Sequence, residues 1–118
     1  MRYALVLFMN PKTWAGLSED EQSAVFTGHE EFQREITESG EYLETKAWGE
    51  PSDSARVRVR GGKPSVTDIA DDEFACGYYL VECASKERAV ELAGKIPDAR
   101  HTAVEVRPIV HEARPEPA

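Results

Sequence analysis

The chain has 118 residues, with 22 acidic and 14 basic side chains and a formal net charge of −8. This length is typical of one domain, and an apolar content of 41% is enough for a hydrophobic core. Such an acidic surface repels phosphate backbones and anionic lipids, and no apolar run approaches the roughly 20 residues that span a bilayer. We therefore expect neither nucleic acid nor a membrane as a partner.

Residues 2–9 predict a β-strand that is apolar on both faces. Side chains alternate between the two faces along a strand. One face carries Tyr3, Leu5, Leu7 and Met9, and the other carries Ala4, Val6 and Phe8. A strand of this kind lies in the centre of a sheet and is covered on both sides.

Residues 19–39 predict a long helix. Ser18 and Glu21 have the spacing of a capping box, and Gly40 is suited to the left-handed residue that ends a helix. A short segment with Trp14 and Leu17 connects the first strand to this helix. The expected inner face of the helix consists of Val25, Phe26, His29, Phe32 and Ile36.

Further strands are expected at residues 41–48, 55–60, 65–67, 76–83 and 102–110. Gly61 and Gly62 turn the chain between the third and fourth strands. On the third strand, Ala55, Val57 and Val59 are expected to face inward. Ser85 is expected to cap a second helix that ends at Ile96 and Pro97. Its expected inner face consists of Ala89, Val90, Leu92 and Ala93.

This order is strand, helix, strand, hairpin, strand, helix, strand, which is the split β-α-β arrangement of the α+β ferredoxin-like fold. We expect a single domain at residues 1–110 and a flexible tail at residues 111–118. The two helices cover one face of an antiparallel sheet. Because the first strand is apolar on its other face too, the sequence predicts a homodimer through the open sheet face.

Two cysteines, Cys76 and Cys83, fall in one predicted strand. Seven positions apart, they should face opposite sides and lie more than about 20 Å from each other, too far for a disulfide. We expect free thiols with a packing role in a reducing, cytoplasmic environment.

Several segments together resemble the YCII-related (YciI-like, DGPF-type) domain family, over nearly all of residues 1–110. They are Tyr3–Met9 with Trp14, Leu17 and Ser18; residues 55–59 with Gly62, Lys63 and residues 66–68; Gly77–Leu80; and residues 96–101 with 104–109. The resemblance implies a dimeric α+β barrel. Most members have no assigned reaction, and a few relatives, including a dehydrochlorinase, act on small cyclic compounds without a bound cofactor.

Two positions depart from the family pattern. The family's signature has Gly-Pro-Phe directly after the aspartate, whereas Asp68 is followed here by Ile69, Ala70 and Asp71. Many relatives also carry an aspartate at the position of Asn10. Both departures fall where the rim of a pocket is expected.

His29 is the first candidate catalytic residue. YciI-like relatives have a histidine at the corresponding helical position and pair it with an acid. A buried imidazole suits a general acid or base, and Asp68 and Asn10 are the candidates to orient its ring. Alternatively, a backbone carbonyl satisfies His29, and Asp68 is a turn residue of the hairpin.

The remaining candidates lie near strand ends. His101, which resembles a His or Tyr position of the family, either donates to a substrate oxygen or is a solvated loop residue. Candidate substrate-binding residues, each of which could instead serve packing or solvation, are Asn10, Trp14, Trp48, Tyr79 and Arg107. His29, His101 and His111 have no further ligands at metal-binding spacing, and no nucleotide-binding or phosphate-binding motif is found, so no metal or cofactor is expected.

We therefore predict a cofactor-independent enzyme in which His29 moves a proton on a cyclic or carbonyl compound, in an isomerisation, elimination or cyclisation. The alternative is a non-catalytic dimer that binds a small molecule or a partner protein, as an accessory to transcription or biosynthesis. A cofactor-free oxygenase is a further alternative that follows only from analogy of fold.

Overall fold

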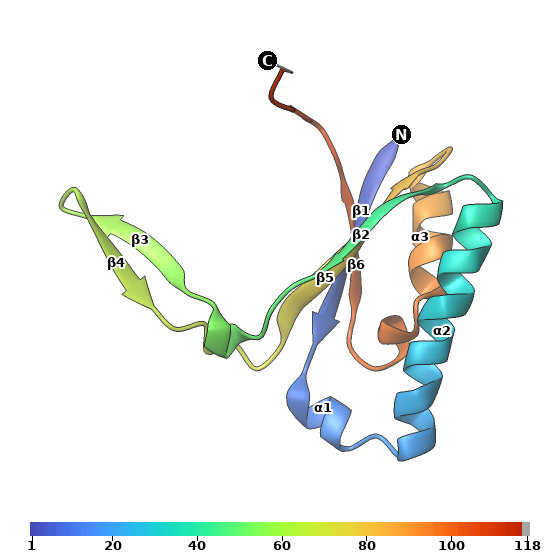
Figure 1. Cartoon of the computed structure of the whole chain (residues 1–118), viewed down its shortest axis with the longest axis horizontal. Coiled ribbons are helices and arrows are strands. Elements are labelled where there is room, and N and C mark those ends of the chain that lie inside the picture. The colour runs from blue at the N-terminus through green and yellow to red at the C-terminus, as the bar shows by residue number, and fades with distance from the viewer. Residues whose placement is uncertain (117–118) are drawn as a thin grey trace.

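The computed structural model describes residues 1–116 and contains a four-stranded antiparallel sheet (Figure 1). The strands follow the order β2-β5-β1-β6, with β2 at Tyr42–Ala47, β5 at Phe74–Glu82, β1 at Arg2–Met9 and β6 at Val104–Pro108. β1 pairs with β5 on one side and with β6 on the other. The central position predicted for the first strand is therefore confirmed.

Two long helices, α2 at Glu19–Glu38 and α3 at Lys86–Lys95, lie on one side of the sheet (Figure 1). Three short helical segments complete the fold, namely α1 at Pro11–Ala15, η1 at Pro51–Asp53 and η2 at Pro97–Arg100. The element order and the antiparallel sheet agree with the predicted α+β ferredoxin-like fold. The segment expected to connect β1 to α2 forms the additional helix α1, which Asn10 caps by accepting from the amides of Lys12 and Thr13.

The hydrophobic core lies between the sheet and these two helices. On β1 the side chains of Tyr3, Leu5 and Leu7 are buried, whereas those of the alternate positions are only partly covered. The helices contribute Phe32, Ile36, Ala89, Leu92 and Ala93. Val90 and Phe26, both expected on inner faces, are 52% and 64% exposed. Neither side chain belongs to the core cluster, so the expectation that both are buried there is wrong.

The ends of the two long helices follow the sequence signals. The Ser18 hydroxyl accepts from the amide of Glu21, and the Glu21 carboxylate accepts from the amide of Ser18. Ser85 caps α3 by accepting from the amide of Arg88, and Gly40 follows α2 with a φ of 75°. The predicted caps are thus confirmed.

A β-bulge in β5 changes the direction of Cys76. The pairing of β1 passes from Gly77 opposite Leu7 to Ala75 opposite Phe8, so Cys76 is an extra residue. Gly77 has a φ of 157°, and a Cβ there would lie 2.4 Å from the carbonyl oxygen of Lys46. Because of the bulge, Cys76 and Cys83 both pack against the core, and the expectation of opposite faces is wrong. Both cysteines are free thiols.

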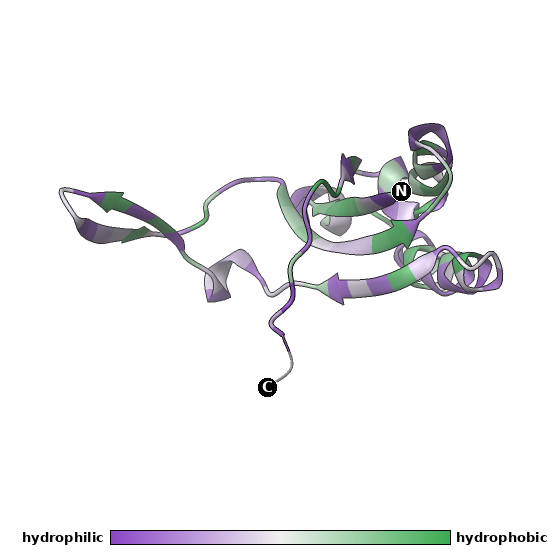
Figure 2. Ribbon diagram, turned by 90° about the horizontal axis from the view of Figure 1, so that it is seen from above, coloured by the Kyte–Doolittle hydropathy of each residue, from purple (hydrophilic) through white to green (hydrophobic). Residues whose placement is uncertain are grey.

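The inserted hairpin forms its own two-stranded sheet, with β3 at Arg56–Arg60 and β4 at Lys63–Thr67. Residues 54–68, called the arm below, extend away from the four-stranded sheet (Figures 1 and 2). Gly61 and Gly62 form its turn with φ values of 57° and 77°. The inward direction expected for Ala55, Val57 and Val59 is wrong, because all three are exposed on the arm.

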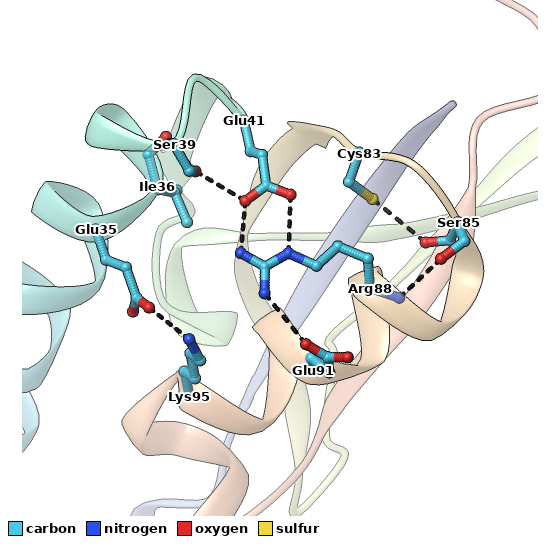
Figure 3. A network of polar contacts seen from close by, with 9 residues as sticks. All are labelled: Glu35, Ile36, Ser39, Glu41, Cys83, Ser85, Arg88, Glu91 and Lys95. Atoms are coloured by element: carbon cyan, nitrogen blue, oxygen red, sulfur yellow. Dashed lines mark hydrogen bonds and ion pairs between the residues drawn. The ribbon is translucent and has the colours of Figure 1, made fainter.

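A polar network joins α2, α3 and the start of β2 at the end of the sheet farthest from the arm (Figure 3). The Arg88 guanidinium donates two hydrogen bonds to Glu41, of 3.0 and 2.8 Å, and a third to Glu91. Lys95 pairs with Glu35 across the two helices. The guanidinium of Arg88 holds the pKa of Glu41 below its ordinary value.

The other sheet face has no helix over it in the described part of the chain (Figure 1). Ala4, Val6 and Leu80 lie there, beside a shallow hollow of about 350 Å³ that Trp48 and Tyr78 also line. Residues 111–116 form neither helix nor strand, although Glu112 pairs with Arg2 at 2.9 Å, and residues 117 and 118 of the predicted tail lie outside the described range. Among the described helices, none is both long and apolar enough to cross a membrane.

Candidate functional site

A cavity of about 420 Å³ lies between α2 and the sheet, at the end of the sheet from which the arm leaves. Its wall is mostly apolar, with Leu7 and Met9 from β1, Val25 and Phe26 from α2, and Ala47 from β2. The polar side chains that reach it include those of His29, Gln33, Tyr79 and Asp98. A mostly apolar cavity of this size with a few convergent polar groups is typical of small-molecule sites.

The His29 ring forms hydrogen bonds through both nitrogen atoms. Nε2 lies 2.7 Å from Oδ1 of Asp98, and Nδ1 lies 2.8 Å from the hydroxyl oxygen of Tyr79. The side chains of His29 and Asp98 are 22% and 16% exposed, so the pair is largely shielded from solvent. The Gln33 amide donates a further hydrogen bond of 3.1 Å to the Tyr79 hydroxyl.

These contacts determine where the proton of a neutral His29 lies. A lone pair on Nε2 would face the Asp98 carboxylate at 2.7 Å and be repelled, so Nε2 carries the hydrogen and donates it. Nδ1 is then the acceptor, and the Tyr79 hydroxyl donates to it. Gln33 fits this arrangement because its amide donates to the oxygen of the same hydroxyl.

The four residues of this hydrogen-bonded network come from three elements of the fold. His29 and Gln33 are one helical turn apart on the inner side of α2, Tyr79 points from β5 toward the helices, and Asp98 lies on η2 directly after α3. Spacing of i and i+4 places His29 and Gln33 above one another, so both reach Tyr79. The Tyr79 ring also stacks on His29 and packs edge-on against Phe32.

Burial shifts two pKa values in the wall of the cavity. The phenol of Tyr79 is almost fully covered, and burial raises its pKa. Burial, with a smaller contribution from the charge of Asp98, raises the pKa of the Cys76 thiol to about 11. Both groups therefore stay protonated at neutral pH, Tyr79 as a hydrogen-bond donor and Cys76 as a thiol.

A second, smaller hollow of about 50 Å³ adjoins the cavity near α1. Asn10 and His101 line it, and Trp14 and Asp98 line both spaces. The side chain of Asn10 is engaged in capping α1. Of the residues predicted from sequence, His29, Trp14 and Tyr79 thus lie together at the cavity, with Asn10 and His101 beside it.

Three predicted residues lie elsewhere. Asp68 is exposed at the base of the arm, Trp48 packs against Tyr78 near the open sheet face, and Arg107 is exposed on β6. The expectation that Asp68 or Asn10 orients the His29 ring is wrong, because Asp98 and Tyr79 occupy its two nitrogen atoms.

The sequence pattern does not indicate a site role for Asp98 or Gln33. Asp98 follows Ile96 and Pro97, where its position suggests only a turn, and Gln33 has the appearance of a solvent-facing helix residue. The signal for Asp98 lies in topology, since the second crossover of a ferredoxin-like fold returns beside the first helix. In the part of the chain that the structure describes, no three His, Cys, Asp or Glu side chains gather as a metal site.

The α+β architecture agrees with a family comparison. The model of the YCII-related domain matches residues 1–113. The chain belongs to the YCII-related domain family. The match covers the sheet, the helices, the arm and every residue of the hydrogen-bonded chain. No protein in a curated set matches this YCII-related chain.

Proposed function

We propose that this YCII-related protein is a cofactor-independent enzyme that moves a proton on a small cyclic or carbonyl compound. The observation that carries the proposal is the unbroken chain from Asp98 through His29 to Tyr79 in the wall of an apolar cavity. An imidazole between a carboxylate and a hydroxyl has the arrangement of a general base that a carboxylate orients.

A proton moves from the substrate to His29 in two coupled transfers through the Tyr79 hydroxyl. The hydroxyl oxygen of Tyr79 takes a proton from an acidic carbon of the substrate while its own proton passes to Nδ1 of His29. The resulting imidazolium is stabilised by Asp98 through Nε2. Return of the proton to another substrate atom gives isomerisation, and loss of a leaving group gives elimination.

The cavity supports a substrate of about one or two rings. Its volume of about 420 Å³ lies in the range of small-molecule sites, and its apolar wall suits a hydrocarbon ring. A carbonyl group in the substrate would make the carbon next to it acidic. The oxygen of that group could accept a hydrogen bond from the side-chain amide of Gln33. Trp14 lies at one side of the cavity, where an indole can stack on such a ring.

We also propose that two copies pair through the open sheet face. Ala4, Val6 and Leu80 lie on it, and Trp48 is 49% exposed beside them. Side chains as large as those of Val6 and Leu80 forgo up to about 1.5–3 kcal/mol each when they stay in water. A second copy of the same sheet covers the same residues symmetrically.

Hydrogen–deuterium exchange tests the proposed chemistry without knowledge of the complete reaction. The protein in D₂O is incubated with cyclohexanone, α-tetralone and a butenolide, and loss of the proton next to the carbonyl is followed by NMR. We expect catalysed exchange for at least one compound and a decrease of about 10²–10⁴ in His29→Asn.

The control is His111→Asn, which changes an exposed histidine of the C-terminal segment and should leave the exchange rate unchanged. Exchange that is equally fast in His29→Asn contradicts the proposal. Binding of the same compounds to the wild-type protein without any catalysed exchange favours the alternative, a non-catalytic small-molecule-binding dimer.

A further inference from the structure

The arm has an apolar face that nothing in the described chain covers. Val57, Val59 and Val66 are 58%, 70% and 66% exposed, and the main contacts of β3 and β4 are with each other. Figure 2 shows hydrophobic and hydrophilic stretches along these two strands, which extend away from the rest of the molecule.

The pairing of β3 with β4 separates the arm into two chemically different faces. Val57 lies opposite Val66, and Val59 lies opposite Pro64, so these residues share one face. Arg58 and Arg60 lie on the other face, opposite Ser65 and Lys63. An isolated two-stranded hairpin is only marginally stable in water, so an arm of this length requires a surface to pack on.

Charge favours this chain itself as the source of that surface. The arm, residues 54–68, carries four basic side chains and one acidic side chain, Asp68, so its net charge is +3 and the remainder of the chain carries −8 less 3, that is −11. Arg56 pairs with Asp71 at 2.9 Å, but Arg58, Arg60 and Lys63 form no ion pair within residues 1–116. A basic arm and an acidic body are complementary between two copies.

A matching surface lies along α2 at the mouth of the cavity. Phe26 is 64% exposed there, and the Trp14 ring packs edge-on against it at 5.7 Å. The α2 sequence contains seven acidic residues and one basic residue, Arg34. Phe26 and Trp14, called the Phe26 rim below, offer apolar contacts, and the acidic side chains of α2 offer ion pairs. The valines and the free basic residues of the arm find neither kind of contact in the described part of their own chain.

We propose that the arm of one copy docks on α2 of a second copy, with its valines on the Phe26 rim, and so covers the partner's cavity. The arginines reach past the edges of the ribbon to the acidic side chains of the helix. The docking does not depend on the chemistry proposed for His29, but the function of the arm as a cover for a substrate rests on that proposed function.

Cross-linking between single-cysteine variants tests this contact directly, in a parent chain whose own two free cysteines are replaced by Cys76→Ala and Cys83→Ala. Val59→Cys and Phe26→Cys are purified separately, mixed, and treated with a short bismaleimide. We expect a covalent dimer in the mixture that is several-fold more abundant than in either variant alone, and less of it at high salt. Val90→Cys, which is exposed on α3, replaces Phe26→Cys as the control and should give no such increase.

A second measurement uses the oligomeric state. Arg58→Glu with Arg60→Glu should raise the dissociation constant of the dimer at least about tenfold in sedimentation, because both charges are reversed without a change in the core. Cross-linking no greater than with Val90→Cys, or cross-links only within one chain in the Val59→Cys/Phe26→Cys double variant, overturns the proposal.

Leu80→Arg separates this interface from the proposed sheet-face dimer. One informative result is that the cross-link between positions 59 and 26 is kept in Leu80→Arg and lost in the variant that combines Arg58→Glu with Arg60→Glu. That result supports the arm contact, whether or not the sheet faces pair. If Leu80→Arg abolishes the dimer and the cross-link never forms in the parent chain, the arm contact is rejected and the sheet-face pairing is retained.

Discussion

Gly28 and Pro97 are in such close contact that only a glycine fits between α2 and η2. A Cβ added at Gly28 would lie 2.4 Å from Cγ of Pro97, well inside the closest distance at which carbon atoms pack. Gly28 directly precedes His29, and Pro97 directly precedes Asp98. The absence of a side chain at one position therefore allows the carboxylate to reach Nε2 of His29 at 2.7 Å.

Gly28→Ala should push η2 away from α2 and lengthen the His29–Asp98 hydrogen bond. In a helix, Gly to Ala ordinarily stabilises by about 0.5–1 kcal/mol, but overpacking here should cost about 1–3 kcal/mol. Urea denaturation measures the free energy of unfolding. Gly94→Ala on α3 is the matched control, since its Cβ would meet nothing within 4 Å and the substitution should be neutral or stabilising. Equal stabilisation by both substitutions contradicts the close contact.

Tyr79→Phe should remove the hydroxyl that joins His29 to the cavity. The ring still packs against Phe32, so the fold should be retained, while catalysed exchange should fall by about 10–10³-fold. Tyr3→Phe is the control, because Tyr3 is buried on the same side of the sheet but lies outside the cavity wall. Undiminished exchange in Tyr79→Phe would mean that His29 takes the proton without this relay.

Arg88→Met should destabilise the protein by about 1–3 kcal/mol at pH 7, because the mostly covered Glu41 keeps only the Ser39 hydroxyl as a donor. The pKa of Glu41 is lower in the folded state than its ordinary value of 4.5, so its contribution is fully present above that value. The contribution is lost as the pH falls through the lowered pKa. The difference in stability between wild type and variant should therefore narrow below about pH 4.5.

Arg107→Met is the control for the effect of Arg88→Met on the free energy of unfolding. Arg107→Met removes an exposed guanidinium whose nearest carboxylate, on Glu105, lies 3.5 Å away, and should change stability by less than about 0.5 kcal/mol. A constant difference between Arg88→Met and wild type from pH 7 to pH 3 would show that the contact with Glu41 contributes by packing alone.

Cys76 should react slowly with iodoacetamide although it lines the cavity. With a pKa of about 11, only about one thiol in a thousand is ionised at pH 8, and the thiolate is the reactive form. Mass spectrometry of the intact Cys83→Ala protein, in which Cys76 is the remaining thiol, should show little alkylation until the chain is unfolded in urea. Alkylation of Cys76 in the folded protein as fast as in urea would rule out the buried environment.

The sequence was sufficient for the central position of β1 and for the long helices because those elements follow strong local signals. The two-sided apolar pattern of β1 predicts a central strand, and the Ser18–Glu21 capping box defines the start of α2. His29 was identifiable as a polar residue on an otherwise apolar helix face. Its partner was not, because Asp98 reaches it through a contact between segments 69 positions apart.

The directions of Cys76 and of the arm valines depart from the sequence pattern for a common physical reason. Strict alternation predicts the direction of a side chain only while the ladder is regular, and the bulge at Cys76 interrupts it. Alternation also predicts that one hairpin face is buried without saying against what. Val57 and Val59 therefore appeared to be core residues, although the arm does not pack on its own sheet.

The protonation of His29 tests the central claim of a proton-transfer chain most directly, and it requires no substrate. Nitrogen NMR of the protein with ¹⁵N-labelled histidine distinguishes a protonated ring nitrogen from an unprotonated one. For neutral His29 we predict a hydrogen on Nε2, held by Asp98, and an unprotonated Nδ1 that accepts from Tyr79. A hydrogen on Nδ1, or a rapidly exchanging mixture of the two forms as in free histidine, would contradict the account.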